Sequence, residues 1–310
     1  MTIAEPIKVS NSEIQTYKDC RRRWYFSYYR RLKPLQQNYT GALALGTRVH
    51  GALDIHYSLG VPLLEAHSGL VAIDRELLTA SFRDTSDLDS EAELGRIMLE
   101  GYGDWVEENG IDQELEMIST EEIISMPLLD GKVILQGKID MRVRRKSDGV
   151  RMFRDFKTSA SFTEFASLAH LDEQILTYMT LETAQNAEDE RSEGGIFTLL
   201  KKVKRTAKAN PPFYEQIEVR HNIYTLRAFW QRLHGTITDM LATRAALDAG
   251  GSHFFHAYPR PSRDCKWKCP FFAICPMMDD GSAAEQAISD MYNVGDPYDY
   301  YKQEDKKGSE

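Results

Sequence analysis

Two charged residues, Asp155 and Lys157, are the first candidates for chemistry in this chain of 310 residues. Residues i and i+2 of a β-strand point to the same face, so a strand here would place a carboxylate beside an ammonium group. Mg²⁺ prefers oxygen ligands, and a lysine can neutralise charge that develops on a phosphate. The pair therefore fits metal-dependent phosphodiester hydrolysis. The alternative interpretation is a surface ion pair at the end of a strand.

A second carboxylate, Asp140, favours the metal-site interpretation. It precedes Asp155 by fifteen positions, and the intervening Ser-Asp-Gly at residues 147–149 is typical of a hairpin turn. Antiparallel strands joined at this turn would bring the two aspartates side by side. Two like charges at short range are costly unless a cation lies between them. We therefore expect both carboxylates and Lys157 to converge at one end of a hairpin.

His50, Gln174 and Tyr178 are weaker candidates. His50 lies on an otherwise apolar face of a predicted helix, where a single histidine is more often structural than a ligand. Gln174 and Tyr178 are four positions apart and would share one face of another helix. An amide and a phenol there could contact a phosphate or a base, although an ordinary amphipathic helix shows the same pattern.

The four cysteines are candidates for a second, separate centre. Three of them lie within eleven residues and the fourth lies near the N-terminus: Cys265, Cys269, Cys275 and Cys20. Disulfides are rare in a reducing cytosol, so this grouping indicates metal binding. The spacing differs from the paired C-x2-C of most structural zinc sites, and four thiolates suit zinc or an iron–sulfur cluster equally.

The elements that must position these residues alternate in type along the chain. Hydrophobic periodicity and capping signals predict helices over residues 12–34 (with Ser12 as the N-cap), 42–57, 62–115, 168–185 and 223–247. Alternating apolar residues bounded by turn signals predict strands over residues 123–128, 133–143, 150–157, 195–203 and 216–219. This order predicts an α/β or α+β fold with a helical insertion at 62–115.

The composition is that of a globular protein, with 42% hydrophobic and 27% charged residues. No apolar run approaches the about 18–20 residues of a membrane span, and the first residues lack the pattern of a signal peptide. We therefore expect a cytoplasmic protein with no membrane partner. The net charge is −9, but residues 279–310 hold nine acidic and only three basic residues. We expect this acidic tail to be unstructured and available to protein partners.

As an ordered set, the candidate residues resemble the RecB-like branch of the PD-(D/E)XK nuclease superfamily. Within it, they are most similar to the CRISPR-associated and AddB-type members that carry a [4Fe–4S] cluster. The resemblance spans about residues 10–276 and rests on these motifs: Ser10-x-Ser12 with Tyr17 and Cys20, Gly46-Thr47-x-x-His50, Gly137-x-Ile139-Asp140, Asp155-x-Lys157-Thr158, Gln174-x-x-x-Tyr178, and Cys265, Cys269 and Cys275. Arg21 follows Cys20, where the family often has proline.

The resemblance implies a restriction-endonuclease-like mixed sheet flanked by helices, in a single nuclease domain over residues 1–278. It implies that His50, Asp140, Asp155 and the backbone carbonyl of Phe156 bind Mg²⁺ or Mn²⁺, with Lys157 serving catalysis. Either Glu121 or Glu122 could assist the metal. Gln174 and Tyr178 would lie beside the active site and contact DNA. The cysteines would hold a [4Fe–4S] cluster that joins the first helix to the last segment, with Zn²⁺ as the alternative.

Two basic clusters are candidates for binding DNA. One lies among aromatic residues in the first predicted helix and comprises Arg21, Arg22, Arg23, Arg30 and Arg31. The other follows the fourth predicted strand and comprises Lys201, Lys202, Lys204, Arg205 and Lys208. Mixtures of basic and aromatic residues suit single strands, whose bases stack while their phosphates pair with cations. The second cluster is the stronger candidate, because little in that loop could belong to a core.

The leading hypothesis is a metal-dependent DNA exonuclease that acts on single strands or free ends in recombination, repair or end processing. Digestion from 5′ to 3′ follows from the resemblance alone, and the size fits a stand-alone phage or prokaryotic enzyme. A second hypothesis is a non-catalytic DNA-binding or assembly subunit that uses the same fold as a scaffold. A third is a zinc-stapled module of unknown role.

Overall fold

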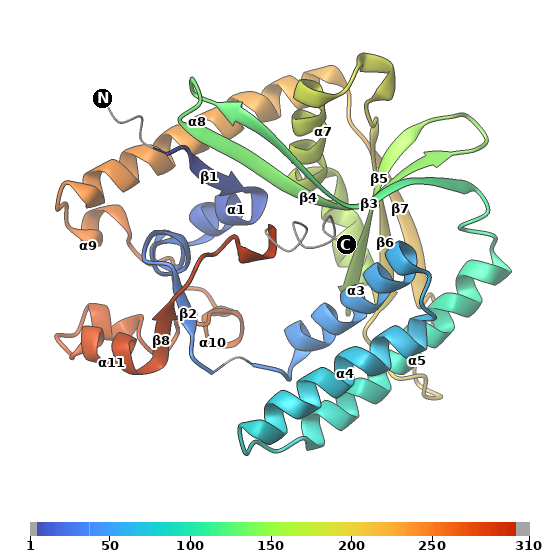
Figure 1. Ribbon diagram of the computed structural model, residues 1–310, viewed down its shortest axis with the longest axis horizontal. Coiled ribbons are helices and arrows are strands. Elements are labelled where there is room, and N and C mark those ends of the chain that lie inside the picture. Colours follow the sequence, from blue (N-terminus) through green and yellow to red (C-terminus); the bar gives the residue numbers. More distant parts are fainter. Residues whose placement is uncertain (1–4, 37, 302–310) are drawn as a thin grey trace, which may run out of the picture. The chain divides into compact units, whose positions relative to one another are not determined.

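The computed structural model describes residues 5–36 and 38–301 and divides the chain into two compact units (Figure 1). The first unit contains Met1–Gln37, Pro127–Gln136 and Arg227–Glu310, and the second contains Asn38–Met126 and Gly137–Leu226. The candidate residues for phosphodiester chemistry all belong to the second unit, whereas the four cysteines all belong to the first. Among the described residues, no helix is both long and apolar enough to cross a membrane.

A mixed β-sheet forms the centre of the second unit. Its strands are β3 (Leu115–Leu128), β4 (Val133–Arg145), β5 (Arg151–Ser159), β6 (Gly194–Lys201) and β7 (Tyr214–Arg220). β3 pairs with β4, β4 pairs antiparallel with β5, β5 pairs parallel with β6, and β6 pairs antiparallel with β7. The expectation of a mixed sheet flanked by helices is confirmed.

Both predicted hairpin turns contain residues in the left-handed backbone region. Asp130 and Gly131 have φ of 56° and 78° between β3 and β4, and Gly149 has φ of 76° between β4 and β5. Glycine enters this region without steric cost, and aspartate tolerates it better than most residues. The turn signals in the sequence therefore locate the hairpins, and the second hairpin sets the pairing of β4 with β5.

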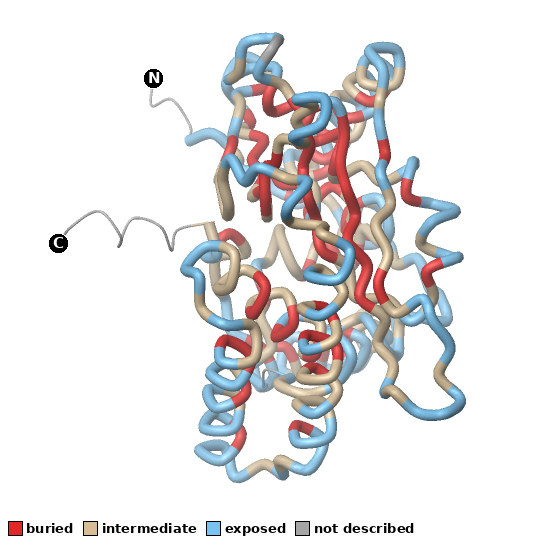
Figure 2. Tube along the Cα trace, turned by 90° about the vertical axis from the view of Figure 1, so that its right-hand side faces the viewer, coloured by how far each residue is buried: buried red, intermediate tan, exposed pale blue. Residues whose placement is uncertain are grey.

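Helices cover both faces of this sheet. They are α3 (Ala42–Leu59), α4 (Leu63–Ala80), α5 (Ser86–Glu108), α6 (Phe162–Leu168), the 3₁₀ segments η2 (Ala169–Leu171) and η3 (Glu188–Glu190), and α7 (Glu173–Gln185). Phe156 of β5 stacks on Tyr57 of α3 with ring centroids 5.6 Å apart. Phe153, on the opposite face of β5, meets Tyr178 of α7 at 5.4 Å. Buried residues predominate along β4, β5 and β6, whereas β3 and β7 are mostly half-buried or exposed (Figure 2).

The helical block predicted over residues 62–115 forms α4 and α5, which contact each other and α3. Leu53 of α3 and Met98 of α5 are fully buried in the same cluster as Met152 of β5. Burial of these apolar side chains is the main force that fixes α3, and with it His50, against the sheet.

The first unit contains the two ends of the chain. Its elements are β1 (Ile7–Ser10), α1 (Asn11–Asp19), α2 (Arg21–Trp24), the π-helix η1 (Tyr25–Tyr29), β2 (Leu32–Pro34), most of α8 (Ile223–Asp248), α9 (His253–His256), α10 (Cys265–Lys268), η4 (Pro276–Met278), α11 (Ala284–Met291), β8 (Tyr292–Val294) and η5 (Asp299–Tyr301). β1 pairs in parallel with the first four residues of β4, Val133–Gln136.

The predicted first helix differs from the structure at its start, in its middle and at its end, where Leu32–Pro34 form β2. The N-cap is Ser10 rather than Ser12, because the Ser10 hydroxyl accepts the Glu13 N–H at 3.3 Å. Cys20 then interrupts the helix with an extended backbone, at φ −160° and ψ 110°. Periodicity alone does not reveal such a break, because the residues on either side keep their helical spacing.

The acidic tail also differs from the expectation that it would be unstructured. Residues 284–291 form α11, and β8 pairs antiparallel with β2. Ile288 and Tyr292 are buried with Phe26 and Phe271 in one apolar cluster. The prediction of an unstructured tail rested on the excess of acidic residues and did not consider these apolar positions. Their burial stabilises the folded segment. Residues 302–310 lie outside the described part of the chain.

Candidate active site

The β4–β5 hairpin brings Asp140 and Asp155 close enough for the charge of Asp155 to act on Asp140. The recorded antiparallel pairs end at Met141 and Arg154, and the same register continued by one position would set Asp140 against Asp155. Directly opposed residues share one face of an antiparallel sheet, with Cβ atoms about 4.5–5.5 Å apart. Asp155 is only 2% exposed, and Asp140 is half-buried. The hairpin thus brings together the two carboxylates that the sequence predicted to converge.

Burial and the mainly negative charges around Asp140 raise the pKa of its carboxyl group. Burial raises the pKa of Asp140 to about 8, and the negative charges of Asp155 and Glu121 add to the increase. Lys157 and the backbone N–H of Phe156 oppose the rise without cancelling it. Two carboxylates in this position are therefore not both ionised at neutral pH unless a further cation binds. Their oxygens are the ligand type that Mg²⁺ and Mn²⁺ prefer, so the donor set fits a divalent ion.

Lys157 lies on the same face of β5 as Asp155, as the spacing predicted. Its Nζ lies 2.7 Å from Asp155 Oδ2. Burial lowers the pKa of Lys157, but the charges of Asp155, Asp172 and Asp140 outweigh burial and raise it overall. Lys157 is therefore a permanent cation at neutral pH, able to donate hydrogen bonds but unable to act as a base.

Gln174 connects these groups from the first turn of α7. Its Nε2 donates to Asp155 Oδ1 at 2.9 Å, and its Oε1 accepts from Lys157 Nζ at 2.9 Å. Its Nε2 also lies 2.9 Å from the hydroxyl of Tyr178, which in turn donates to the carbonyl of Lys138 at 2.6 Å. Asp172 caps α7 by accepting the Gln174 N–H at 2.7 Å. Gln174 thus lies beside Asp155 and fixes the side chains of Asp155 and Lys157, and Tyr178 contacts Gln174.

His50 lies on α3 and is half-buried. Burial lowers its pKa, Asp155 opposes that shift, and the charges of Lys157 and Lys202 add to it. The imidazole is therefore neutral at pH 7, which is the form that binds a metal. Gly46 brings α3 close to β5, because a Cβ at this glycine would lie 3.2 Å from the Thr158 hydroxyl. Within residues 5–36 and 38–301, no three His, Cys, Asp or Glu side chains already form a metal-binding group.

Comparison with known protein families matches residues 8–276 to the PD-(D/E)XK nuclease superfamily. The chain belongs to this superfamily. Asp155-Phe156-Lys157 matches the (D/E)XK part of its name, whereas Ile139 precedes Asp140 in place of the proline. No curated protein matches the chain.

Two solved structures resemble this PD-(D/E)XK protein. A candidate exonuclease from Eubacterium rectale is 12% identical, with a TM-score of 0.48 over 87% of this chain and 87% of that one. The protein SSO0001 is 17% identical, with a TM-score of 0.34 over 78% of this chain and 88% of that one.

The structure distinguishes Glu121 from Glu122, which the sequence left open. Glu121 has φ of 53°, which turns it out of the regular strand, and it pairs with Lys138. Burial raises its pKa, and Asp54 contributes to that rise through a side-chain hydrogen bond. Glu122 instead pairs with Arg142 and accepts from Ser119. Glu121 is therefore the glutamate on the side of Asp140, whose pKa its charge raises.

Asp54 is a residue that sequence reasoning missed. It follows His50 by four positions on α3 and therefore shares a helix face with it. Its carboxyl group also accepts from the Ser58 hydroxyl at 3.0 Å. The i, i+4 spacing of His50 and Asp54 could have predicted from the sequence that Asp54 lies on the same helix face as His50.

The second basic cluster lies partly beside the site. The charge of Lys202 acts on His50, while burial lowers the pKa of Lys202 itself. Arg205 donates to Tyr214 at 2.7 Å and lies over the Phe213 ring at 3.7 Å. Lys201 donates to the Asn210 carbonyl at 3.1 Å. Within this loop, Lys202 is thus the cation whose charge acts on His50, and Lys204 and Lys208 are exposed to solvent.

The arginines of the first cluster are largely engaged within the first unit. The side chains of Arg21, Arg22 and Arg30 form ion pairs with Asp239, Asp279 and Glu285, respectively. Arg22 is only 2% exposed. A paired, buried guanidinium has little capacity left for a phosphate, so these contacts favour the lysine loop as the DNA-binding surface.

The four cysteines lie in the first unit as half-buried free thiols. Burial raises the pKa of both Cys269 and Cys275, and the charge of Cys20 adds to each shift. Cys20 therefore lies within electrostatic reach of cysteines more than 240 positions away in the sequence. The Arg260 N–H donates to Cys20 Sγ at 3.4 Å, and the Ser262 N–H donates to Cys265 Sγ at 3.3 Å. Within the part of the chain that the structure describes, these cysteines do not already form a metal-binding group.

Proposed function

We propose that this protein is a Mg²⁺- or Mn²⁺-dependent deoxyribonuclease that degrades single-stranded DNA from a free end in recombination, repair or end processing. The observation that carries the proposal is the β4–β5 hairpin, in which the charge of Asp155 acts on Asp140 and Lys157 is held against Asp155. Superfamily membership supports a phosphodiester substrate. The exonuclease mode and its 5′ to 3′ polarity rest on the resemblance in the motifs.

The proposed ligands of the divalent ion are Asp140, Asp155, His50 and the Phe156 carbonyl. The N–H of Phe156 faces Asp140, and the N–H and C=O of one strand residue point to the same side. The carbonyl of Phe156 is thus directed toward β4. When bound, the ion would supply Lewis acidity toward the phosphate and would lower the pKa of a water molecule.

The side chains of this protein would contribute orientation and charge. Lys157 stays protonated, so its Nζ can donate a hydrogen bond to a phosphate oxygen as negative charge develops there. Gln174 fixes Lys157 and Asp155 relative to each other before the substrate arrives. Such preorganisation avoids the cost of reorienting both groups during the reaction.

The deciding experiment compares wild type, Asp155→Asn and the control Asp87→Asn, which changes an exposed aspartate of α5. Each protein is incubated with single-stranded DNA labelled at the 5′ or 3′ end, with Mg²⁺, Mn²⁺ or EDTA. We expect divalent-dependent release of labelled mononucleotides or short products by wild type and the control, and at least about a thousandfold loss in Asp155→Asn. Wild type that binds DNA without cleaving it under any of these conditions would support the non-catalytic subunit instead.

We further propose that the four cysteines hold a [4Fe–4S] cluster, with Zn²⁺ as the alternative occupant. The support is the electrostatic proximity of Cys20 to Cys269 and Cys275, together with the resemblance in the motifs. Within the first unit, such a centre would join the end of α1 to the segment that follows α9. Analysis of the purified protein for iron, acid-labile sulfide and zinc tests this proposal, because only iron with matching sulfide agrees with a cluster.

A further inference from the structure

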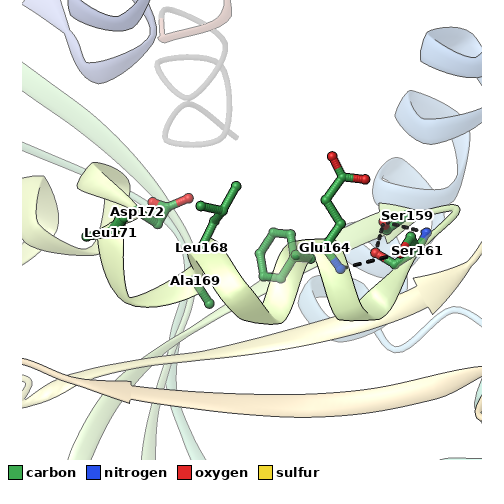
Figure 3. A pocket seen from close by; sticks show the side chains of 8 residues that line it. Ser159, Ser161, Glu164, Leu168, Ala169, Leu171 and Asp172 are labelled. Carbon is green, nitrogen blue, oxygen red and sulfur yellow. Dashed lines mark hydrogen bonds between the residues drawn. The ribbon is translucent and has the colours of Figure 1, made fainter.

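An open pocket of about 490 Å³ lies at the segment between β5 and α7 (Figure 3). Phe165, Leu168, Ala169 and Leu171 provide its apolar lining. Leu168 and Leu171 are 56% and 62% exposed, although they are large apolar side chains. The Phe165 ring is held by an edge contact with Phe197 at 5.1 Å. The pocket therefore offers a fixed aromatic ring and two uncovered leucines to a ligand.

The pocket adjoins the candidate active site at both ends. Ser159, which lines it, follows Lys157 by two positions on β5 and is on the same face of the strand. Asp172 lines the opposite end and caps α7, two positions before Gln174. The charge of Asp172 also acts on Lys157. A molecule in the pocket would thus lie next to the groups proposed to act on a phosphate.

The polar lining excludes a phosphate from the pocket itself. None of its eight lining residues is basic, and two of them, Glu164 and Asp172, are acidic. Figure 3 shows Glu164 and Leu168 extending to the same side of α6. A phosphate would be repelled by the carboxylates. A flat group with apolar faces and N–H donors at its edge would meet complementary partners, and exposed apolar surface of this kind marks interaction sites.

We propose that this pocket binds the nucleobase of a nucleotide next to the scissile phosphate. The base would lie against Phe165 and Leu168, with its exocyclic amino group directed toward Glu164. This inference rests on the proposed function and deepens it. It assigns the base to α6, and it assigns the phosphate to Lys157 and to the divalent ion that the carboxylates would bind. Adenine, cytosine and guanine carry the amino group, whereas thymine lacks it.

The first test uses Leu168→Asp and the matched control Ile73→Asp, which changes a residue of α4 that is 55% exposed. A single abasic nucleotide is moved stepwise along an end-labelled strand, and single-turnover cleavage is measured with Mg²⁺. In wild type and Ile73→Asp, we expect one position at which the missing base slows cleavage about tenfold, the scale for loss of one stacked base. Leu168→Asp should cleave the intact strand correspondingly more slowly and show no such position. Abasic profiles that are the same in wild type and Leu168→Asp would overturn the inference.

A second readout is independent of cleavage. A strand that contains one 2-aminopurine, an adenine isomer whose fluorescence falls on stacking, is titrated with each protein in EDTA. We expect quenching with wild type and Ile73→Asp and its loss with Leu168→Asp. Glu164→Gln should reduce the preference for amino-bearing bases over thymine while retaining the quenching. Quenching without any cleavage would refute the nuclease and leave the base pocket standing, whereas cleavage with unchanged quenching in Leu168→Asp would refute the pocket alone.

Discussion

Gln174 and Asp155 are joined by a hydrogen bond of 2.9 Å from Nε2 to Oδ1, although 19 positions separate them in the sequence. The carboxamide oxygen of Gln174 accepts from Lys157, so one side chain of α7 orients the acidic and the basic group of β5. The resemblance predicted Gln174 as a DNA contact, and that role remains a prediction. Its hydrogen bonds support a positioning role in addition.

Replacing Gln174 by alanine should lower kcat for DNA cleavage about 10- to 100-fold, because hydrogen bonds to charged groups contribute about 1.5–3 kcal/mol. KM should change little if Gln174 acts by positioning. Gln185→Ala is the control, because this glutamine of the same helix donates to the Ser125 carbonyl on the surface. Steady-state kinetics decide the matter, and a rise in KM with unchanged kcat would indicate a DNA contact instead.

Asp140 should make the stability of the metal-free protein depend on pH. Its pKa is raised from 3.8 to about 8, so the folded state holds a proton that the unfolded chain releases. The free energy of unfolding therefore falls as the pH rises through this window. In EDTA, we expect the thermal midpoint of wild type to fall relative to Asp140→Asn between about pH 6 and pH 8, by at least about 2 °C.

Saturating Mg²⁺ should reduce this difference, because a bound cation favours the ionised carboxylate. Thermal denaturation at several pH values, with EDTA or with Mg²⁺, provides the measurement. Buried acids remote from Asp140 contribute equally to both proteins and cancel in the comparison. Parallel curves for wild type and Asp140→Asn in EDTA would contradict the raised pKa.

Glu121 and Glu122 should differ in their effect on the metal. Glu121→Gln removes a charge that acts on Asp140 and should raise the Mg²⁺ concentration for half-maximal cleavage about tenfold, as is typical for residues around metal ligands. Glu122→Gln is the matched control, because Arg142 keeps its other partner, Glu182, at 2.9 Å. Mg²⁺ titrations of cleavage rate compare the two, and equal shifts would show that the left-handed conformation of Glu121 in β3 has no role at the site.

The folded state should depend on Asp112, because Asp112 supplies the counter-charge of the buried Arg154 guanidinium. The Arg154 side chain is buried, and it donates to Asp112 Oδ1 at 2.7 Å and to the Tyr102 hydroxyl at 2.8 Å. Asp112→Asn leaves this guanidinium without its counter-charge and should lower the free energy of unfolding by about 2 kcal/mol, less than for a fully buried pair because Asp112 is partly exposed.

The control for this prediction is Glu116→Gln, which breaks an exposed ion pair with Arg144 and should cost less than about 1 kcal/mol. Urea denaturation of both variants gives the comparison. A loss of stability in Asp112→Asn no larger than in Glu116→Gln would show that the buried guanidinium does not depend on this carboxylate.

Cys20→Ser should remove the iron and visible absorbance of the purified protein if the four thiolates hold a cluster, because three ligands bind it less firmly. The same substitution should lower the thermal midpoint, since the first unit then loses a link between its two ends. Asp155→Asn serves as the control and should keep its iron. Equal iron contents in the two variants would exclude Cys20 as a ligand.

Local pattern was enough to predict the convergence of the candidate site. The spacing of Asp155 and Lys157 determines that they share a strand face, and the Ser-Asp-Gly turn determines that Asp140 returns beside Asp155. Both follow from the two-residue period of a strand and from turn chemistry, which act over a few residues. The same short-range signals predict most helices and strands of the second unit, but β3 begins at Leu115 rather than at residue 123, and α6 was not predicted.

Contacts between distant segments decided the rest. Glu121 rather than Glu122 lies on the side of Asp140 because Glu121 adopts a left-handed conformation in β3. The charge of Cys20 acts on Cys275 because segments far apart in the sequence fold together in the first unit. The acidic segment is ordered because Ile288 and Tyr292 find apolar partners elsewhere in the first unit. Such effects arise from burial, which removes surface from water only after tertiary packing has formed, and no pattern within a short stretch of sequence records them.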